Sequence, residues 1–302
     1  MAWTYNGTVP GPEIRVREGD TVKIRLRNQS GAKHGLFFHG LHLPPRVALQ
    51  EEVPVDPDHE YTYEFIARPA GTHLYHCSWN MAEHISRGLY GVFIVEAANE
   101  QKFDREFVYV LSDWNSKDLK GEGHHETGHP QTMMDNDITT INDKAVAGDH
   151  PIIMDVKEGQ RVKIRLANIG HLPHTVRFSE GFTLTHEDGY PISEPRKESS
   201  ITLYPGKRHD IAITPDRPGK FPFYHSVTFP PSFTERESHQ EGYDKQNHEG
   251  TQKVKAGLVP GDPGKAENGN SYAIQLTKEE VIFVLDVKMD HLSKIEPGEK
   301  RP

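Results

Sequence analysis

A histidine–cysteine pair, His76-Cys77, lies in the stretch Thr72–His84 and combines the residue types that redox metal chemistry requires. Cys77 is the only cysteine among 302 residues, so it cannot form a disulfide within the chain. A thiolate with two imidazoles is the ligand set of a blue copper site, because soft sulfur and borderline nitrogen suit both oxidation states of copper. The alternative is that Cys77 is a small buried hydrophobic residue. We prefer the metal interpretation because suitably spaced histidines lie on both sides of it, His34 upstream and His84 downstream.

Composition and charge favour a two-domain β protein and argue against nucleic-acid-binding and membrane-spanning proteins. At roughly 150 residues per domain, the length predicts two domains, each able to bury a core. The hydrophobic fraction of 34%, with 26 glycines and 22 prolines, favours short strands joined by turns. A net charge of −9 argues against a nucleic-acid surface, which needs clustered Lys and Arg. The longest apolar stretches, such as Val281–Leu285, are too short to span a bilayer, and no signal peptide is visible at Met1.

The chain also repeats itself. Val16–Asn28 matches Val156–Asn168 without a gap at an offset of 140 residues, which places His34 opposite His174.

A second block, Arg68–Ser78, matches Arg217–Val227 at an offset of 149 residues and places His225 opposite His76. Two matching blocks in the same order indicate an internal duplication.

We therefore predict an all-β protein with two Greek-key β-sandwich domains, residues 1–98 and 104–250. The alternation of apolar and basic residues in Thr21–Arg27 is typical of a strand with one solvated face. Residues 251–302 are predicted to be a loop-rich tail. Its one strand candidate, Glu280–Val287, would be an edge strand in need of a partner, for example on a neighbouring subunit.

From Asn6–Pro12 onward, each half resembles a cupredoxin domain, and the pair resembles the two-domain, laccase-like multicopper oxidases and the copper nitrite reductases. The most specific motif is His76-Cys77 followed by His84 and Gly88–Gly91. In those families an early histidine, the cysteine and a later loop histidine bind the blue (type 1) copper. The resemblance implies that these ligands are His34, Cys77 and His84, so that only the first domain has a type 1 site.

Five residues after the loop histidine, a methionine often supplies a weak axial bond in those families. Leu89 occupies this position and has no lone pair to donate, which should raise the reduction potential of the copper. Met81 is an alternative axial donor, but packing of its side chain in the loop is the simpler expectation.

The copper oxidases of this family reduce dioxygen at a three-copper cluster bound by four His-x-His pairs. The first domain has Phe37 and Ser78 where two of these histidines belong, and the offset of 140 places Arg177 and Ser179 at two positions of the second domain. A standard trinuclear cluster is therefore not expected.

The resemblance to nitrite reductases implies a simpler second copper site, held by His39 and His76 of one subunit and His225 of the neighbouring subunit in a homotrimer. These three residues are our candidates for the catalytic centre. Nitrite reduction also uses an Asp and a second-domain His to deliver protons, whereas this chain has Phe37 and Ser179 there.

Several further histidines could bind copper or could have only a solvated or structural role. His42 is a candidate additional ligand near the second copper or a turn-capping residue, and His174 is a ligand or a relic of a lost copper site. His171 lies near that lost site, and His186 is expected to line the same cleft. His73 is expected at the surface, because it lies on the opposite strand face from His76. The cluster His124–His129 could load copper, but such loops are often only solvated.

The leading functional hypothesis is a copper-dependent oxidoreductase of the multicopper oxidase family. A small-molecule or protein donor would reduce the type 1 copper near an exposed edge of His84, and Cys77 would pass the electron through His76 to the second copper. The alternatives are a nitrite reductase-like enzyme, a blue-copper electron carrier or copper-binding protein with a degenerate second site, and a metal-free structural trimer. By family resemblance, the protein is expected to be periplasmic or secreted.

Overall fold

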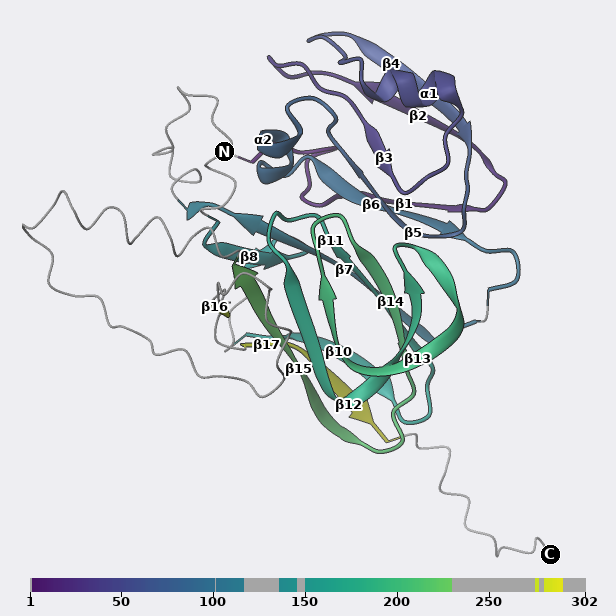
Figure 1. Cartoon of the computed structure of the whole chain (residues 1–302), viewed down its shortest axis with the longest axis vertical. Helices are drawn as coiled ribbons and strands as arrows, with labels where there is room; N and C mark the ends of the chain where they lie inside the picture. The colour runs from purple at the N-terminus through teal and green to yellow at the C-terminus, as the bar shows by residue number, and fades with distance from the viewer. Residues whose placement is uncertain are drawn as a thin grey trace, which may run out of the picture.

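The computed structural model describes residues 2–100, 102–116, 136–145, 150–229, 275–276 and 280–289, and it shows two β domains packed on each other (Figure 1). The all-β prediction is confirmed, since short helices occur only in the first domain among the described residues.

The first domain is a sandwich of a four-stranded sheet, in the order β1-β6-β5-β3, and a β2-β4 ribbon. Its elements are β1 (Gly11–Arg17), β2 (Thr21–Arg27), β3 (Phe37–His39), α1 (Pro45–Glu51), β4 (Glu60–Ile66), β5 (Gly71–His76), α2 (Met81–Ser86) and β6 (Tyr90–Glu96). Val22 and Leu26 of β2 are buried while the basic residues between them are exposed, as the alternating pattern predicts. All six residues of β5 are buried, because one face of this strand covers the domain core and the other meets the second domain.

The second domain is one continuous hydrogen-bonded sheet that folds over on itself. Its strands are β7 (Arg105–Trp114), β8 (Ile138–Ile141), β9 (Lys144–Ala145), β10 (Ile152–Lys157), β11 (Val162–Asn168), β12 (His174–Glu187), β13 (Tyr190–Leu203), β14 (Arg208–Ile213), β15 (Gly219–Phe229), β16 (Gln275–Leu276) and β17 (Glu280–Lys288). The long strand β12 joins the layers, because its first half pairs with β15 and its second half with β14.

The strand predicted in the C-terminal tail exists, but its predicted place at an edge is wrong. β17 lies between β10, with which it is parallel, and β15, with which it is antiparallel, in the same chain. Ile282, Phe283, Leu285 and Val287 are buried in the core of the second domain. The apolar run is therefore continuous because both faces of an interior strand are covered. Most of the predicted tail lies outside the described residues.

The domains meet through an apolar cluster and a buried charge network. Leu74, Tyr90 and Ile94 of the first domain pack with Val110 and Ile169 of the second.

The charge network centres on Asp210, which is completely buried on β14. Asp210 accepts hydrogen bonds from the guanidinium of Arg165 at 2.9 Å and from the hydroxyl of Thr72, in the first domain, at 2.7 Å. The Lys163 ammonium lies 3.2 Å from the same carboxylate. Burial alone would raise the pKa of Asp210, but the charges of Arg165 and Lys163 outweigh it and hold this pKa below its usual value.

The structure also corrects the alignment of the two halves. Asn28 and Asn168 make equivalent bonds, each with its side-chain amide donating to the carbonyl four residues later (2.7 and 2.8 Å), so the offset of 140 holds in this region. In the second block, however, Gly71 and Gly219 each begin a strand with a left-handed φ, +144° and +149°. Their separation is 148 residues, so the offset of 149 is wrong by one.

Glu51, at the end of α1, ties this helix to β3 by accepting a hydrogen bond from the Phe38 backbone N–H at 2.7 Å. Burial raises the pKa of its carboxyl to about 7. Because the folded-state pKa exceeds the ordinary value of 4.5, the native protein retains a proton that the unfolded chain has lost, and stability falls as pH rises from about 4.5 to 7.

We expect Glu51→Gln, which mimics the protonated carboxyl, to remove this loss. The stability of the variant relative to wild type should increase between pH 5 and pH 8 by up to about 3 kcal/mol, measured by urea unfolding. The exposed Glu60→Gln is the control and should show no such increase. A constant difference between Glu51→Gln and wild type across this range would contradict the prediction.

Candidate metal centre

His34, Cys77 and His84 are brought together by three separate elements of the first domain. His34 precedes β3, Cys77 follows β5 and His84 lies on α2. Their ligand atoms all lie within 4.8 Å of one another. The Cys77 Sγ is 3.0 Å from His84 Nδ1 and 3.7 Å from His34 Nδ1, and the two Nδ1 atoms are 3.3 Å apart. One thiol and two imidazole nitrogens thus converge on one point, as a type 1 copper site requires.

The loop between Cys77 and His84 is closed by backbone hydrogen bonds. Leu89 N–H donates to the His84 carbonyl at 3.1 Å, and Cys77 N–H donates to the Leu89 carbonyl at 3.0 Å. These bonds attach α2 and the start of β6 to the end of β5, so the two ligands keep a fixed separation. Burial raises the pKa of the Cys77 thiol, while the Gly35 N–H, 3.5 Å from Sγ, favours the thiolate.

Electron entry at an exposed edge of His84 does not agree with the structure. His84 is only 3% exposed, and the Trp3 ring lies edge-on against it with a centroid separation of 4.8 Å. The same ring also contacts His34, at 5.4 Å. Burial is the main reason that the pKa of His84 falls to about 4, so its imidazole is neutral and able to bind a metal. Sequence reasoning missed Trp3, whose only signal was its position just before the Asn6–Pro12 motif.

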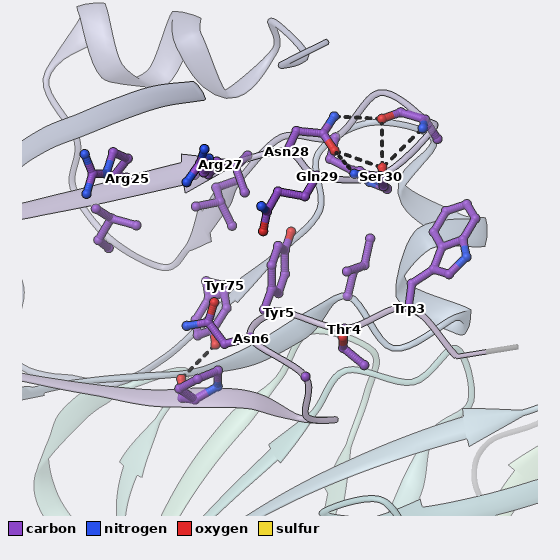
Figure 2. Close-up of a pocket in the computed structure, with 18 of the residues that line it drawn as sticks. Trp3, Thr4, Tyr5, Asn6, Arg25, Arg27, Asn28, Gln29, Ser30 and Tyr75 are labelled. Carbon is purple, nitrogen blue, oxygen red and sulfur yellow. Dashed lines mark hydrogen bonds between the residues drawn. The ribbon is translucent and has the colours of Figure 1, made fainter. Parts of the chain in front are cut away.

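A pocket of about 870 Å³, lined in part by Trp3, adjoins the site. His34 and Leu89 are among its lining residues, and the Tyr5 side chain points from the N-terminal segment towards Gln29, which follows β2 (Figure 2). Gln29 and Asn6 supply polar groups to the lining. Of the three clustered residues, His34 is the one that lines this pocket.

Leu89 is 4% exposed and lines the same pocket as His34; its axial position stays a prediction. Met81 is 47% exposed on α2, so neither role suggested for it, axial donor or packed loop residue, agrees with its position.

Two of the three residues predicted for a second copper, His39 on β3 and His76 on β5, lie on paired strands, on the sheet face opposite to the type 1 cluster. The ring centroids of His39 and His76 are 5.8 Å apart, and Phe37 stacks on His76 at 5.1 Å. His76 Nδ1 lies 3.1 Å from the Cys77 carbonyl. When Nδ1 donates this bond, Nε2 is left as the lone-pair nitrogen, which fixes the tautomer for metal binding.

Gly206 of the second domain lies in close contact with the His39 ring. A β-carbon added to Gly206 would lie 2.7 Å from His39 Cε1, and the φ of +79° at this glycine is also unfavourable for other residues. Burial, followed by the nearby Arg208 guanidinium, lowers the pKa of His39 to about 4. Sequence reasoning missed Gly206 and Arg208, although the Pro205-Gly206 pair is a turn signal.

His225 is not where the sequence alignment placed it. Phe37 is opposite His76 on the paired strands, whereas the residue opposite Arg177 is Tyr224. With the corrected offset, His225 corresponds to Cys77 and faces the interior of its own domain. It is 4% exposed, and its Nε2 lies 2.8 Å from His174 Nδ1. Burial beside His174 lowers the pKa of His225 to about 3. The structure thus does not bring His225 to the face that carries His39 and His76.

The other weighed histidines have structural partners. His42 Nε2 lies 3.0 Å from the Tyr190 hydroxyl of the second domain, and His171 Nε2 lies 2.9 Å from the Ser86 hydroxyl of α2. His186 lies 3.7 Å from Asp210, away from His174. The surface position predicted for His73 is wrong: this residue is fully buried, and its ring lies against Gly189 of the second domain, where an added β-carbon would be 3.2 Å from His73 Cε1. The cluster His124–His129 lies outside the described residues.

Comparisons with family models and with solved structures point to the same family. Family models described as multicopper oxidase match residues 1–100 and 105–246. The structure of a blue copper oxidase from Nitrosomonas europaea is 30% identical and superposes with a TM-score of 0.64, over 75% of this chain and 72% of that one. The chain belongs to the multicopper oxidase family. Its members bind copper, and the two-imidazole, one-thiol cluster fits this metal.

Two curated relatives in this family show different extents of similarity. Copper resistance protein A from Pseudomonas syringae pv. tomato is 32% identical over 52% of this chain, which spans 28% of that protein. A copper-containing nitrite reductase from Neisseria meningitidis serogroup B is 32% identical over 72% of this chain and 57% of its own length. No helix among the described residues is long and apolar enough to cross a membrane.

For this member of the multicopper oxidase family, we expect Leu89→Met to lower the type 1 reduction potential without removing copper. An axial thioether stabilises oxidised copper more than a methyl group does. We expect a decrease of at least about 59 mV, which is a tenfold change in a one-electron equilibrium. Protein-film voltammetry measures it, with Leu89→Val as the apolar control. An unchanged or higher potential in Leu89→Met would show that residue 89 is not axial.

Proposed function

We propose that this multicopper oxidase is a copper-dependent oxidoreductase with two electron-transfer sites in its first domain. His34, Cys77 and His84 bind a type 1 copper, and His39 and His76 supply part of a second copper site. The observation that carries the proposal is the adjacency of Cys77 and His76, whose side chains lie on opposite sides of the same strand end. One peptide bond therefore links the two sites.

Copper bound at these sites would supply reversible one-electron chemistry. The protein residues provide the remaining conditions. Burial of His34, Cys77 and His84, with Trp3 against both imidazoles, excludes water from the first site. The Gly35 N–H holds the sulfur in place. Cys77 and His76 provide a covalent path between the sites.

The pocket beside His34 and Leu89 favours a small-molecule electron donor over a protein donor. A volume of about 870 Å³ is in the range of sites that enclose a small organic ligand. A donor in this pocket would contact the His34 imidazole directly, whereas a protein surface would be separated from His84 by Trp3.

The second site is incomplete with His39 and His76 alone. We propose that a neighbouring subunit completes it in a homotrimer, which would explain why one chain supplies too few ligands on that face. Sedimentation tests the assembly, and a monomer would exclude it. By resemblance to the family, we place the protein in the periplasm or outside the cell.

Two experiments test the function together. Copper content and EPR spectra of the loaded protein should show one type 1 and one type 2 copper per chain, and His39→Ala should lose only the type 2 signal. With a hydroquinone as donor, dioxygen uptake should stop in His39→Ala. If the wild type holds type 1 copper alone and consumes neither dioxygen nor nitrite, the protein is a blue-copper carrier, the alternative favoured by Phe37 and Ser78. Nitrite consumption without dioxygen uptake would favour the nitrite reductase-like alternative.

A further inference from the structure

The second domain places two histidines where the first domain has two of its copper ligands. The equivalent bonds of Asn28 and Asn168 set an offset of 140 residues, which makes His174 the counterpart of His34. The strands that begin at Gly71 and Gly219 set an offset of 148, which makes His225 the counterpart of Cys77.

The geometry of this histidine pair parallels that of the first domain. His34 directs Nδ1 at the Cys77 sulfur, 3.7 Å away, and His174 directs Nδ1 at His225 Nε2, 2.8 Å away. Both second-domain rings are buried, His174 completely and His225 to 4% exposure. They stack with a centroid separation of 5.1 Å.

A buried carboxylate fixes the orientation of the pair. Asp113 is 1% exposed, and it lies 3.1 Å from His174 Nε2. Asp113 also accepts hydrogen bonds from the backbone N–H groups of His171 and Leu172, at 3.0 Å each. When His174 donates its Nε2 proton to Asp113, its Nδ1 carries the lone pair that faces His225. A histidine held by a carboxylate in this way is characteristic of metal ligands.

We propose that His174 Nδ1 and His225 Nε2 form a second-domain binding site for one cuprous ion, with Asp113 as the positioning residue. Two neutral imidazoles without a thiolate suit copper(I), which accepts two ligands, whereas zinc sites in proteins almost always have four. The present 2.8 Å separation is that of a hydrogen bond, in which His225 Nε2 donates to His174 Nδ1; to admit the metal, the rings would move apart and His225 would change to the tautomer that carries its proton on Nδ1. This inference does not depend on the proposed second copper at His39 and His76.

The test uses the full chain in the background Cys77→Ser, His39→Ala, which removes the other two proposed sites. Copper(I) is titrated anaerobically against a colorimetric copper(I) chelator, and the bound metal is examined by X-ray absorption. We expect tight binding with imidazole scattering. Adding His225→Gln should abolish the tight binding, and adding Asp113→Asn should weaken it by about 10- to 100-fold. His186→Gln, a half-buried histidine bonded to Thr185, is the matched control and should bind like the background.

Folding is checked separately, because His225 is buried. In a chain that retains Cys77, His225→Gln should keep the type 1 absorption and the wild-type circular dichroism. If that variant fails to fold, Asp113→Asn in the double-variant background decides the question by its copper(I) affinity. The proposal is overturned if the background binds no copper(I) tightly, or if affinity is unchanged in a folded His225→Gln or in Asp113→Asn. Tight binding of zinc(II) but not copper(I) would overturn the choice of metal.

Discussion

Replacing Cys77 by serine should remove the intense visible colour of the copper-loaded protein completely. The colour of a type 1 site arises from charge transfer between a thiolate sulfur and copper, and Cys77 is the only cysteine in the chain. Its Sγ is the atom on which His34 and His84 converge. Electron transfer from a donor to the second site should fall by several orders of magnitude, since the substitution also removes the sulfur at the start of the covalent path to His76.

The measurements are visible and EPR spectra of equally loaded proteins, with donor oxidation followed under the same conditions. Ser78→Ala is the matched control, because Ser78 is the next residue but is not among the three clustered ligands. It should retain the colour. A Cys77→Ser protein with an undiminished charge-transfer band would rule out Cys77 as the ligand and with it the proposed type 1 site.

Replacing Asp210 by alanine should destabilise the protein by about 3–5 kcal/mol, because it leaves buried cations without their shared acceptor. Lys163 and Arg165 are both essentially buried, and Arg165 also donates to Thr72 of the first domain at 2.9 Å. Since the pKa of Asp210 lies below its ordinary value of 3.8, the wild type should lose this contribution only as pH falls below about 4.

Urea unfolding at neutral pH measures the loss. Asp216→Ala is the control, because this side chain is 83% exposed in its pair with Arg217 and should change stability by less than about 0.5 kcal/mol. A loss below about 1 kcal/mol for Asp210→Ala would show that the network does not hold the domains together.

Local pattern was sufficient to predict individual strands such as Thr21–Arg27 and Glu280–Val287, but the slip of one residue in the second repeat was invisible in the sequence. The sequences that begin at Arg68 and Arg217 match at an offset of 149 residues. The left-handed φ values at Gly71 and Gly219, however, define the structurally equivalent positions, which are 148 residues apart. A one-residue slip moves a side chain to the other face of a strand. His225 therefore has Cys77 rather than His76 as its counterpart.

The type 1 cluster was predictable because its ligands follow a specific motif. The parts of the site that were missed come from elsewhere in the fold. Trp3 reaches the cluster from the N-terminal segment, and Gly206 reaches His39 from the second domain. His73 alternates with His76 as expected, but strand periodicity cannot show that Gly189 of the second domain lies against its ring. Such contacts depend on tertiary packing, within the first domain for Trp3 and between the domains for Gly206 and His73, which no local sequence pattern encodes.

The position of β17 sets an order of events during synthesis of the chain. The first domain, with all three clustered ligands, is complete within about the first hundred residues and can fold as a unit while translation continues. The second domain cannot close until residues 280–288 arrive to fill the gap between β10 and β15. At about 5–20 residues per second, the ribosome needs several seconds to pass from the end of β15 to β17. During that interval the nascent chain exposes two unpaired strand edges and an open core, and this is when it most needs protection from aggregation.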